Sequence, residues 1–190
     1  TMPGREVLYA RIPGDGSKGG LMLCNHTDVV PVEAEYWDYP AFEGVIEDGR
    51  VYGRGAVDMK GGGVMQLISF LLAKRQGLKL TRDLIFCAVP DEETGGSMGM
   101  GWLYDHRPEL LEVEYEINEG GGGAAEFAGQ ETQLFGVATN EKQICWLRIT
   151  AVGTPGHGSV PHKDNSALRL MRALIRLAEW DRGITYTPES

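Results

Sequence analysis

The 190-residue sequence is poor in cysteine and in positive charge, and it lacks a long uninterrupted apolar run. Its three cysteines, Cys24, Cys87 and Cys145, lie far apart in apolar segments, which is typical of buried reduced thiols and argues against a disulfide framework or a cysteine-based zinc site. Only 18 basic residues stand against 27 acidic ones, so a nucleic-acid-binding surface is not expected. No apolar run approaches the roughly 20 residues that span a bilayer, and residues 1–5 are not followed by a signal-peptide core. These absences predict a soluble, acidic, cytoplasmic protein with no nucleic-acid or membrane partner.

Short apolar runs alternate with helical periodicity along most of the chain. Residues 21–25 and 84–89 are continuous apolar runs, as expected of strands that are buried on both faces. Apolar residues from Val64 to Leu72 recur at helical spacing. Further strands are expected over residues 6–12, 114–118 and 134–138, and an interrupted helix over residues 97–111. This alternation predicts an α/β fold with a mostly parallel sheet flanked by helices.

The pattern changes near residue 142. Residues 144–152 predict a longer strand, which a turn rich in glycine, proline and histidine follows. After Asn165 and Ser166, both good helix N-caps, apolar residues again recur at helical spacing, and three arginines occupy the opposite, solvated face. We therefore expect a first domain over residues 1–141 and the beginning of an α+β domain over residues 142–190.

Histidine and carboxylate residues follow the predicted strands at their carboxyl ends, where ligand sites form in open α/β sheets. They are His26, Asp28, Asp58, Glu92, Glu93 and Glu119. Clustered carboxylates repel one another and raise each other's pKa, and a divalent cation relieves that repulsion. Histidine with carboxylates is a ligand set typical of zinc. The sequence therefore predicts a metal site at this edge of the sheet.

Spacing within this set indicates different roles for its members. His26 and Asp28 lie at i and i+2 on one face of a strand, so Asp28 can accept a hydrogen bond from the second ring nitrogen of a metal-bound His26. The adjacent side chains of Glu92 and Glu93 point apart, so one can bind metal while the other takes a proton from an attacking water. A satisfied histidine and an acidic loop are the simpler interpretations of these residues taken separately.

Two other glycine-containing segments fall short of known motifs. Gly53-Arg54-Gly55 lacks the third glycine of a dinucleotide-binding fingerprint and precedes an acidic residue that would repel pyrophosphate. Residues 156–160 lack the closing glycine of the nucleophile elbow. A nucleotide-binding domain and a serine hydrolase are therefore the weaker hypotheses.

Five ordered segments resemble the motifs of the dizinc family that includes aminoacylases, carboxypeptidases, acetylornithine deacetylase and succinyl-diaminopimelate desuccinylase. They are residues 23–31 with Trp37, Pro40 and Phe42, then residues 48–62, 90–96, 118–121 and 153–161. The resemblance implies a phosphorylase/hydrolase-like metallopeptidase core, followed by the start of a lid and dimerisation domain. It also implies a homodimer formed through that lid.

The resemblance further implies two Zn²⁺ ions, with Co²⁺ or Mn²⁺ as alternatives. His26 and Glu119 would bind one ion, and Asp58 would bridge both. Glu93 would bind the second ion. The implied substrate is a small N-acyl amino acid or a short peptide, whose amide bond is hydrolysed.

The remaining polar residues take catalytic roles by the same resemblance. Glu92 would act as general base and then as general acid, and Asp28 would orient His26. His157 would reach the neighbouring subunit's active site from the lid and stabilise the developing oxyanion.

One expected ligand has no counterpart in these 190 residues, namely the family's last histidine, which binds the second ion. His106 lies in a helix–proline segment and His162 stands beside His157 in the lid turn. We therefore expect two incomplete domains. The alternative hypothesis is a catalytically incomplete fragment that binds at most one metal ion and acts as a structural or assembly piece.

Overall fold

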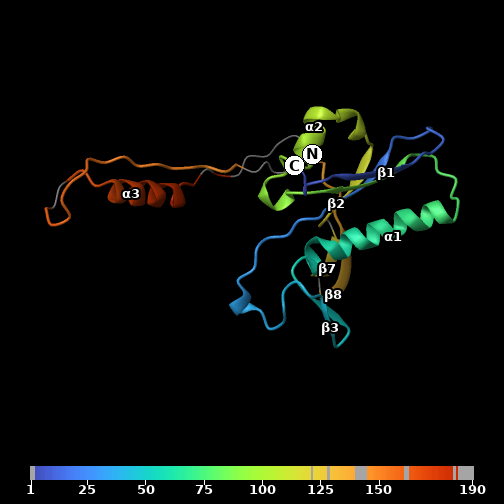
Figure 1. Cartoon of the computed structure of the whole chain (residues 1–190), viewed down its shortest axis with the longest axis horizontal. Helices are drawn as coiled ribbons and strands as arrows, with labels where there is room; N and C mark the ends of the chain where they lie inside the picture. The colour runs from blue at the N-terminus through green and yellow to red at the C-terminus, as the bar shows by residue number, and fades with distance from the viewer. Residues whose placement is uncertain are drawn as a thin grey trace. The chain divides into compact units, whose positions relative to one another are not determined.

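The computed structural model describes residues 3–120, 122–127, 129–139, 145–160, 163–181 and 183. The chain divides into two compact units, Thr1–Phe135 and Gly136–Ser190, each of which is described by itself. The first unit contains β1 (Leu8–Ile12), β2 (Leu21–His26), β3 (Val45–Glu47), β4 (Arg50–Tyr52), α1 (Gly62–Arg75), β5 (Leu84–Val89), α2 (Met100–His106), β6 (Tyr115–Ile117), β7 (Gly122–Phe127) and β8 (Gln130–Phe135) (Figure 1). Short helical turns lie between them: η1 (Ala34–Tyr36), η2 (Ala56–Gly61), η3 (Glu92–Thr94) and η4 (Pro108–Leu110).

The main sheet has the strand order β1-β5-β2-β6. Strand β2 pairs in parallel with both β5 and β6, and β1 pairs antiparallel with β5 at the edge. The two continuous apolar runs of the sequence form β2 and β5, the two central strands. The expected α/β class with a mostly parallel sheet flanked by helices is confirmed.

Helices α1 and α2 cover opposite faces of this sheet (Figure 1). On the α1 face, Phe70 of the helix packs with Leu23 and Phe86 of the strands. On the α2 face, Leu103 of the helix packs with residues that alternate with those, among them Met22 and Cys87. Because successive strand residues point to opposite faces, two helical layers explain why β2 and β5 are apolar at nearly every position.

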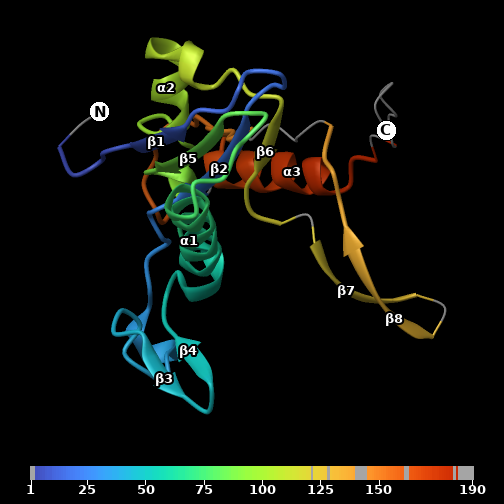
Figure 2. The ribbon, with the colours of Figure 1, turned by 90° about the vertical axis from the view of Figure 1, so that its right-hand side faces the viewer.

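Two further sheets in the first unit are two-stranded ribbons, β3–β4 and β7–β8 (Figure 2). Strand β7 lies in a glycine-rich segment and is not expected from the sequence, because glycine is depleted in strands. Strand β8 ends at Phe135, so the strand expected over residues 134–138 begins and ends earlier than predicted. The helix expected over residues 97–111 is divided into α2 and η4, and Pro108 begins the second piece.

The segment Ala56–Arg75, formed by η2 and α1, is long and apolar enough to cross a membrane by length and composition. Core helices of soluble proteins meet the same criterion, so this is weak evidence for a membrane span. Four of its residues, Met59, Gln66, Phe70 and Ala73, are buried, and Phe70 and Ala73 belong to the core cluster of the sheet.

The second unit contains α3 (Ser166–Ala178), and the predicted helix start is confirmed. The side chain of Asn165 accepts a hydrogen bond from the main-chain N–H of Leu168, as an N-cap does. The strand expected over residues 144–152 is not found: Ile144 lies outside the described residues, and residues 145–152 have no strand partner among the described residues of this unit. Cys145 is consequently exposed, which corrects the expectation that all three cysteines are buried, whereas Cys24 and Cys87 are buried.

Candidate metal centre

Three of the predicted ligands meet at one point in the first unit. One ligand atom each from His26, Asp58 and Glu119 lies within 4.8 Å of the other two. The Nε2 atom of His26 lies 2.9 Å from Oδ1 of Asp58 and 3.6 Å from Oε2 of Glu119. The His26 side chain is 2% exposed, whereas those of Asp58 and Glu119 are 64% and 46% exposed. The group therefore has a buried nitrogen on one side and solvent-accessible oxygens on the other.

The three residues come from elements that are distant in sequence. His26 is the last residue of β2, Glu119 follows the neighbouring strand β6, and Asp58 lies in η2 just before α1. Because β2 and β6 are parallel neighbours, their carboxyl ends meet at one edge of the sheet. The ligands meet at the carboxyl ends of parallel strands, as the sequence predicted.

The ring of His26 is held in one orientation. Its Nδ1 lies 3.0 Å from the main-chain oxygen of Asp28, and a carbonyl oxygen can only accept, so Nδ1 carries a proton and donates it. Nε2 of a neutral ring then presents a lone pair to the carboxylate oxygen of Asp58. In that state Nε2 of His26 and Oδ1 of Asp58 are both acceptors and lie 2.9 Å apart, so either a proton or a metal cation must bind to them. The donor set, one imidazole nitrogen with carboxylate oxygens, therefore fits a divalent metal ion.

The electrostatics of this group point the same way. Burial alone lowers the pKa of His26, but the hydrogen bonds to Asp58 and to the Asp28 carbonyl, with the charges of Glu92 and Glu119, raise it above its usual value. Burial is the main cause of the raised pKa of Glu92; His26 lowers this pKa, and the carboxylates of Glu119, Glu93 and Asp28 raise it by smaller amounts. Neighbouring carboxylates contribute to both shifts, and a metal cation would neutralise that negative charge.

Asp28 has a different role from the one expected of its side chain. Its carboxylate accepts hydrogen bonds from the main-chain N–H groups of Glu92 and Glu93, at 3.1 and 3.2 Å. These N–H groups open the short turn η3 and have no partner within it, so a carboxylate acceptor is favoured there. The Asp28 carboxylate lies 3.6 Å from Nδ1 of His26, and the main-chain oxygen is the closer acceptor. Asp28 therefore orients His26 through its main chain and holds η3 through its side chain.

Glu92 is close to this group, whereas Glu93 is not part of it. Oε2 of Glu92 lies 4.0 Å from Nε2 of His26. Glu93 is fixed by its main-chain bond to Asp28, and among the described residues its side chain does not join the three-residue group. Neither glutamate belongs to the three-residue group, so metal binding by Glu93 and proton transfer by Glu92 remain predictions.

Two residues that support the site were not singled out from the sequence. Asp91 is 1% exposed, has a positive φ of 57°, and accepts hydrogen bonds from Met98 N–H and the Ser97 hydroxyl. The Nζ of Lys60 donates to the main-chain oxygen of Thr27 at 2.6 Å, between His26 and Asp28. Asp91 has a sequence signal, because aspartate tolerates the left-handed region, but Lys60 has none, since its acceptor is a main-chain atom.

The other described histidines are not members of the three-residue group. His157 belongs to the second unit, where Nδ1 and the Ser159 hydroxyl form a 2.8 Å hydrogen bond. His106 ends α2 and stacks on Trp102. His162 lies outside the described residues.

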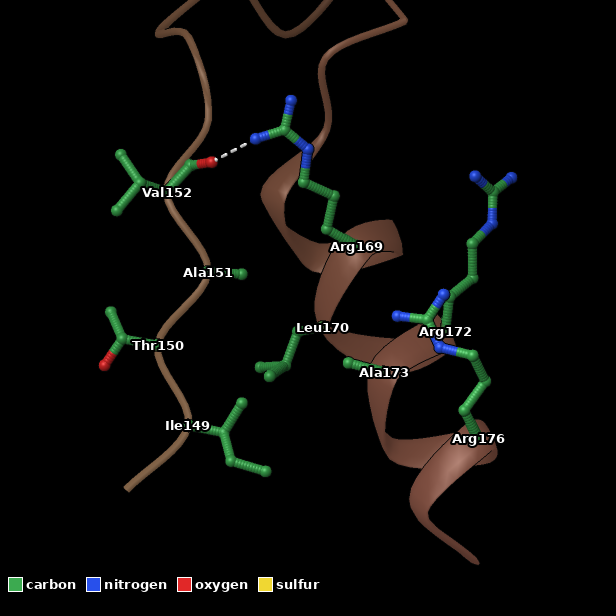
Figure 3. A pocket seen from close by; sticks show the side chains of 9 residues that line it. All are labelled: Ile149, Thr150, Ala151, Val152, Arg169, Leu170, Arg172, Ala173 and Arg176. Carbon is green, nitrogen blue, oxygen red and sulfur yellow. Dashed lines mark hydrogen bonds between the residues drawn. The ribbon is translucent and has the colours of Figure 1, made fainter. Parts of the chain in front are cut away.

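The residues of the metal group do not line the hollow that is found in the second unit. In the second unit a hollow of about 560 Å³ lies between residues 149–152 and α3, with Leu170 and Ala173 pointing toward the extended segment (Figure 3). Arg169 reaches the main-chain oxygen of Val152, at 2.7 Å, and also pairs with Asp164. None of the predicted site residues lines this hollow. The candidate centre is instead an open edge of the sheet.

Comparisons with known proteins place the chain in a family. Residues 22–129 match the family described as Peptidase family M20/M25/M40. Aminoacylase-1 of Sus scrofa is 37% identical over 178 residues, which is 92% of this chain and 42% of that protein. The N-fatty-acyl-amino acid synthase/hydrolase PM20D1 of Xenopus tropicalis is 33% identical over 164 residues, or 83% of this chain and 31% of that protein.

A solved structure agrees with the fold. Human carnosine dipeptidase 1 superposes with a TM-score of 0.52 at 23% identity, over 60% of this chain and 24% of that one. The chain spans less than half the length of the relatives it matches. The family match, which covers more than half of the sequence, shows that the chain belongs to peptidase family M20/M25/M40.

Proposed function

We propose that this chain forms the metal-binding part of a metal-dependent hydrolase that cleaves the amide bond of an N-acyl amino acid or a short peptide. The observation that carries the proposal is the convergence of His26, Asp58 and Glu119 around one point, with Nε2 of His26 facing carboxylate oxygen. Membership of the peptidase family supports the reaction class. The names of the relatives, aminoacylase-1 and an N-fatty-acyl-amino acid hydrolase, support an acylated amino acid as substrate.

In this proposal His26, Asp58 and Glu119 would hold one divalent ion, and Asp58 with Glu93 would contribute to a second. Zn²⁺ suits the mixed nitrogen and oxygen donors, with Co²⁺ or Mn²⁺ as alternatives. When bound, such an ion supplies Lewis acidity, which polarises a carbonyl and lowers the pKa of water.

Glu92 is suited to move the proton. Its carboxylate is beside the metal group, and its raised pKa makes it a stronger proton acceptor than an ordinary carboxylate. As the water oxygen attacks the carbonyl carbon, Glu92 takes the water proton. As the carbon–nitrogen bond breaks, the same proton passes to the leaving amine. His157 would stabilise the oxyanion, which rests on the motif resemblance of residues 153–161.

A homodimer formed through the second unit and a cytoplasmic location complete the proposal. Exposed apolar residues of α3, such as Met171 and Ile175, support an interface in that unit. Cys24 and Cys87 are register partners and remain free thiols, which supports a reducing compartment.

A second candidate is a chain that binds one ion and does not hydrolyse substrate by itself. The observation that favours it is that Glu93 stands outside the three-ligand group. The stoichiometry of metal binding distinguishes this candidate from a two-ion centre.

The test measures Zn²⁺ or Co²⁺ binding to the purified chain by calorimetry, comparing the parent with His26→Ala and His106→Ala. His106 is an exposed histidine of the same unit that contacts Trp102 and no ligand of the group, so it is the matched control. We expect His26→Ala to weaken binding at least about 100-fold, because it removes the only nitrogen ligand of the three and leaves carboxylates alone. Equal binding by the parent and His26→Ala would contradict the metal site.

The reaction is tested on the protein that carries this chain, with N-acetyl amino acids and dipeptides as substrates. Replacing Glu92 by glutamine should lower kcat at least about 100-fold, since general acid–base catalysis contributes about 10²–10⁴. The exposed Glu112→Gln is the control and should leave kcat unchanged. An active Glu92→Gln enzyme would remove Glu92 from this role.

A further inference from the structure

Strands β2 and β6 stop pairing just before they deliver His26 and Glu119. Their parallel ladder runs from Leu21 opposite Tyr115 to Leu23 opposite Ile117 and ends there. On the other side, β2 stays paired with β5 as far as His26. The gap between the two ligand-bearing ends is therefore not fixed by the sheet itself.

The side chain of Gln66, from α1, fills this gap. Its Nε2 donates to the main-chain oxygens of Cys24 and Ile117, each at 3.0 Å. One amide group thus joins β2 and β6 at the position where the ladder has ended. The orientation of the amide is settled by chemistry, because both carbonyl oxygens can only accept.

Asn25 fixes the other end of the same amide. Its Nδ2 donates to Oε1 of Gln66 at 2.9 Å, so three hydrogen bonds hold the Gln66 side chain. Asn25 and Gln66 are 6% and 9% exposed, which keeps water from replacing these bonds. Gly63, one turn before Gln66, makes room for Asn25: a Cβ there would approach Oδ1 of Asn25 to 3.1 Å.

We infer that the Asn25–Gln66 pair is a positioning device, which sets the separation of His26 and Glu119 and thereby the affinity of the metal centre. Cys24 lies two residues before His26, and Ile117 lies two residues before Glu119. The Gln66 amide therefore binds each strand at the residue two positions before the metal ligand of that strand. Neither Asn25 nor Gln66 belongs to the three-ligand group, so the pair acts through the strands, as residues that orient metal ligands do. The inference rests on the proposed metal site and deepens it.

The test compares Gln66→Met with Phe70→Leu in the purified chain. Methionine keeps the length of Gln66 and removes all three hydrogen bonds. Phe70 is buried on the same helix, one turn further along, and packs on Phe86 away from the ligands, so Phe70→Leu loosens the same helix–sheet contact without touching the amide. Zn²⁺ affinity is measured by competition with a chromogenic chelator, and the Co²⁺ absorption spectrum reports the geometry of the ligands. Urea unfolding gives the stability of each variant.

We expect Gln66→Met to weaken Zn²⁺ binding about 10–100-fold, as is typical when a residue supporting metal ligands is removed, and to alter the Co²⁺ spectrum. Phe70→Leu should lower stability and leave both readouts as in the parent. Gln66→Glu should also weaken binding, since it sets a carboxylate oxygen against two carbonyl oxygens. Parent-like affinity in Gln66→Met, or equal losses in Phe70→Leu, would overturn the inference while leaving the proposed function intact.

Asn25→Ala provides an independent variant should Gln66→Met fail to fold. It keeps both bonds from Gln66 to the strands but frees the amide to rotate, so we expect a smaller loss of affinity than in Gln66→Met. An unchanged affinity in Asn25→Ala would contradict the role of the pair. A parent chain that binds no ion would contradict the proposed function, and this inference with it.

Discussion

Helix α1 of the first unit and helix α3 of the second have 14 and 13 residues, but only α1 buries side chains. Phe70, Ala73 and the polar Gln66 of α1 are buried. In α3, Met171, Leu174 and Ile175 are 47–54% exposed, although apolar and polar residues are more clearly separated along this helix than along α1. An amphipathic pattern therefore predicts that a helix forms, but burial depends on a surface that accepts its apolar face.

The same contrast explains why the candidate metal ligands cluster in the first unit. The first unit has a two-sided core around β2 and β5, and this core holds His26 against the carboxylates at the sheet edge. The second unit contains the turn with His157 and the helix α3, whose described residues are all at least partly exposed. A buried ligand needs a packed core behind it, and only the first unit provides one among the described residues.

The largest expected effect tests the core itself. Replacing Phe86 by alanine should lower the free energy of unfolding by about 3–5 kcal/mol, because Phe86 is 4% exposed and packs on Phe70. Leu174→Ala in α3 should change it by no more than about 0.5 kcal/mol, as is usual for exposed positions. Urea unfolding of both variants gives the two numbers. Similar values would remove the contrast between the units.

A smaller effect is expected where polar groups support the site. Asp28→Asn should lower the free energy of unfolding by about 1.5–3 kcal/mol, since the carboxylate accepts two main-chain hydrogen bonds and an amide can accept only one of them. The exposed Asp38→Asn, in the loop that follows, is the matched control and should have little effect. If the Asp28→Asn variant is as stable as the control, this carboxylate does not stabilise η3.

The smallest effect concerns α3. Asn165→Ala should cost about 1 kcal/mol of helix stability, because it removes the N-cap acceptor for Leu168 N–H. Asn165→Asp keeps an acceptor and should preserve the helix. Amide and Cα chemical shifts of residues 166–178 report local helicity. If the two variants have the same helicity, the cap does not stabilise α3.

Some features could be predicted from the sequence because their causes are local. The apolar runs of β2 and β5 and the cap at Asn165 depend on neighbouring residues, and they appear where expected. The meeting of His26 with Glu119 could also be predicted, because parallel strands bring their carboxyl ends together. The strand expected over residues 144–152 failed for the opposite reason, since a strand exists only with a partner.

Polar bonds to the main chain were the least predictable part of the site. The sequence suggested that the Asp28 carboxylate would accept a hydrogen bond from His26. Instead, the His26 ring donates to the main-chain oxygen of Asp28, and the carboxylate accepts a hydrogen bond from the first N–H of η3. Lys60 and Gln66 likewise bind main-chain oxygens of residues that are 33 to 51 positions away. Since every residue carries the same carbonyl, the side-chain pattern does not indicate which one is bound.

By itself the sequence determined the fold class, the order of the central elements and the residue types at the sheet edge. These features follow from hydrophobic periodicity and from the alternation of strands and helices, both of which can be recognised in the sequence. Only the tertiary structure decided which atoms face one another: Nε2 of His26 against Asp58, Nδ1 of His26 against the main-chain oxygen of Asp28, and the amide of Gln66 between β2 and β6. Such contacts depend on the packing of distant segments to within a fraction of an ångström, which no spacing along the chain specifies.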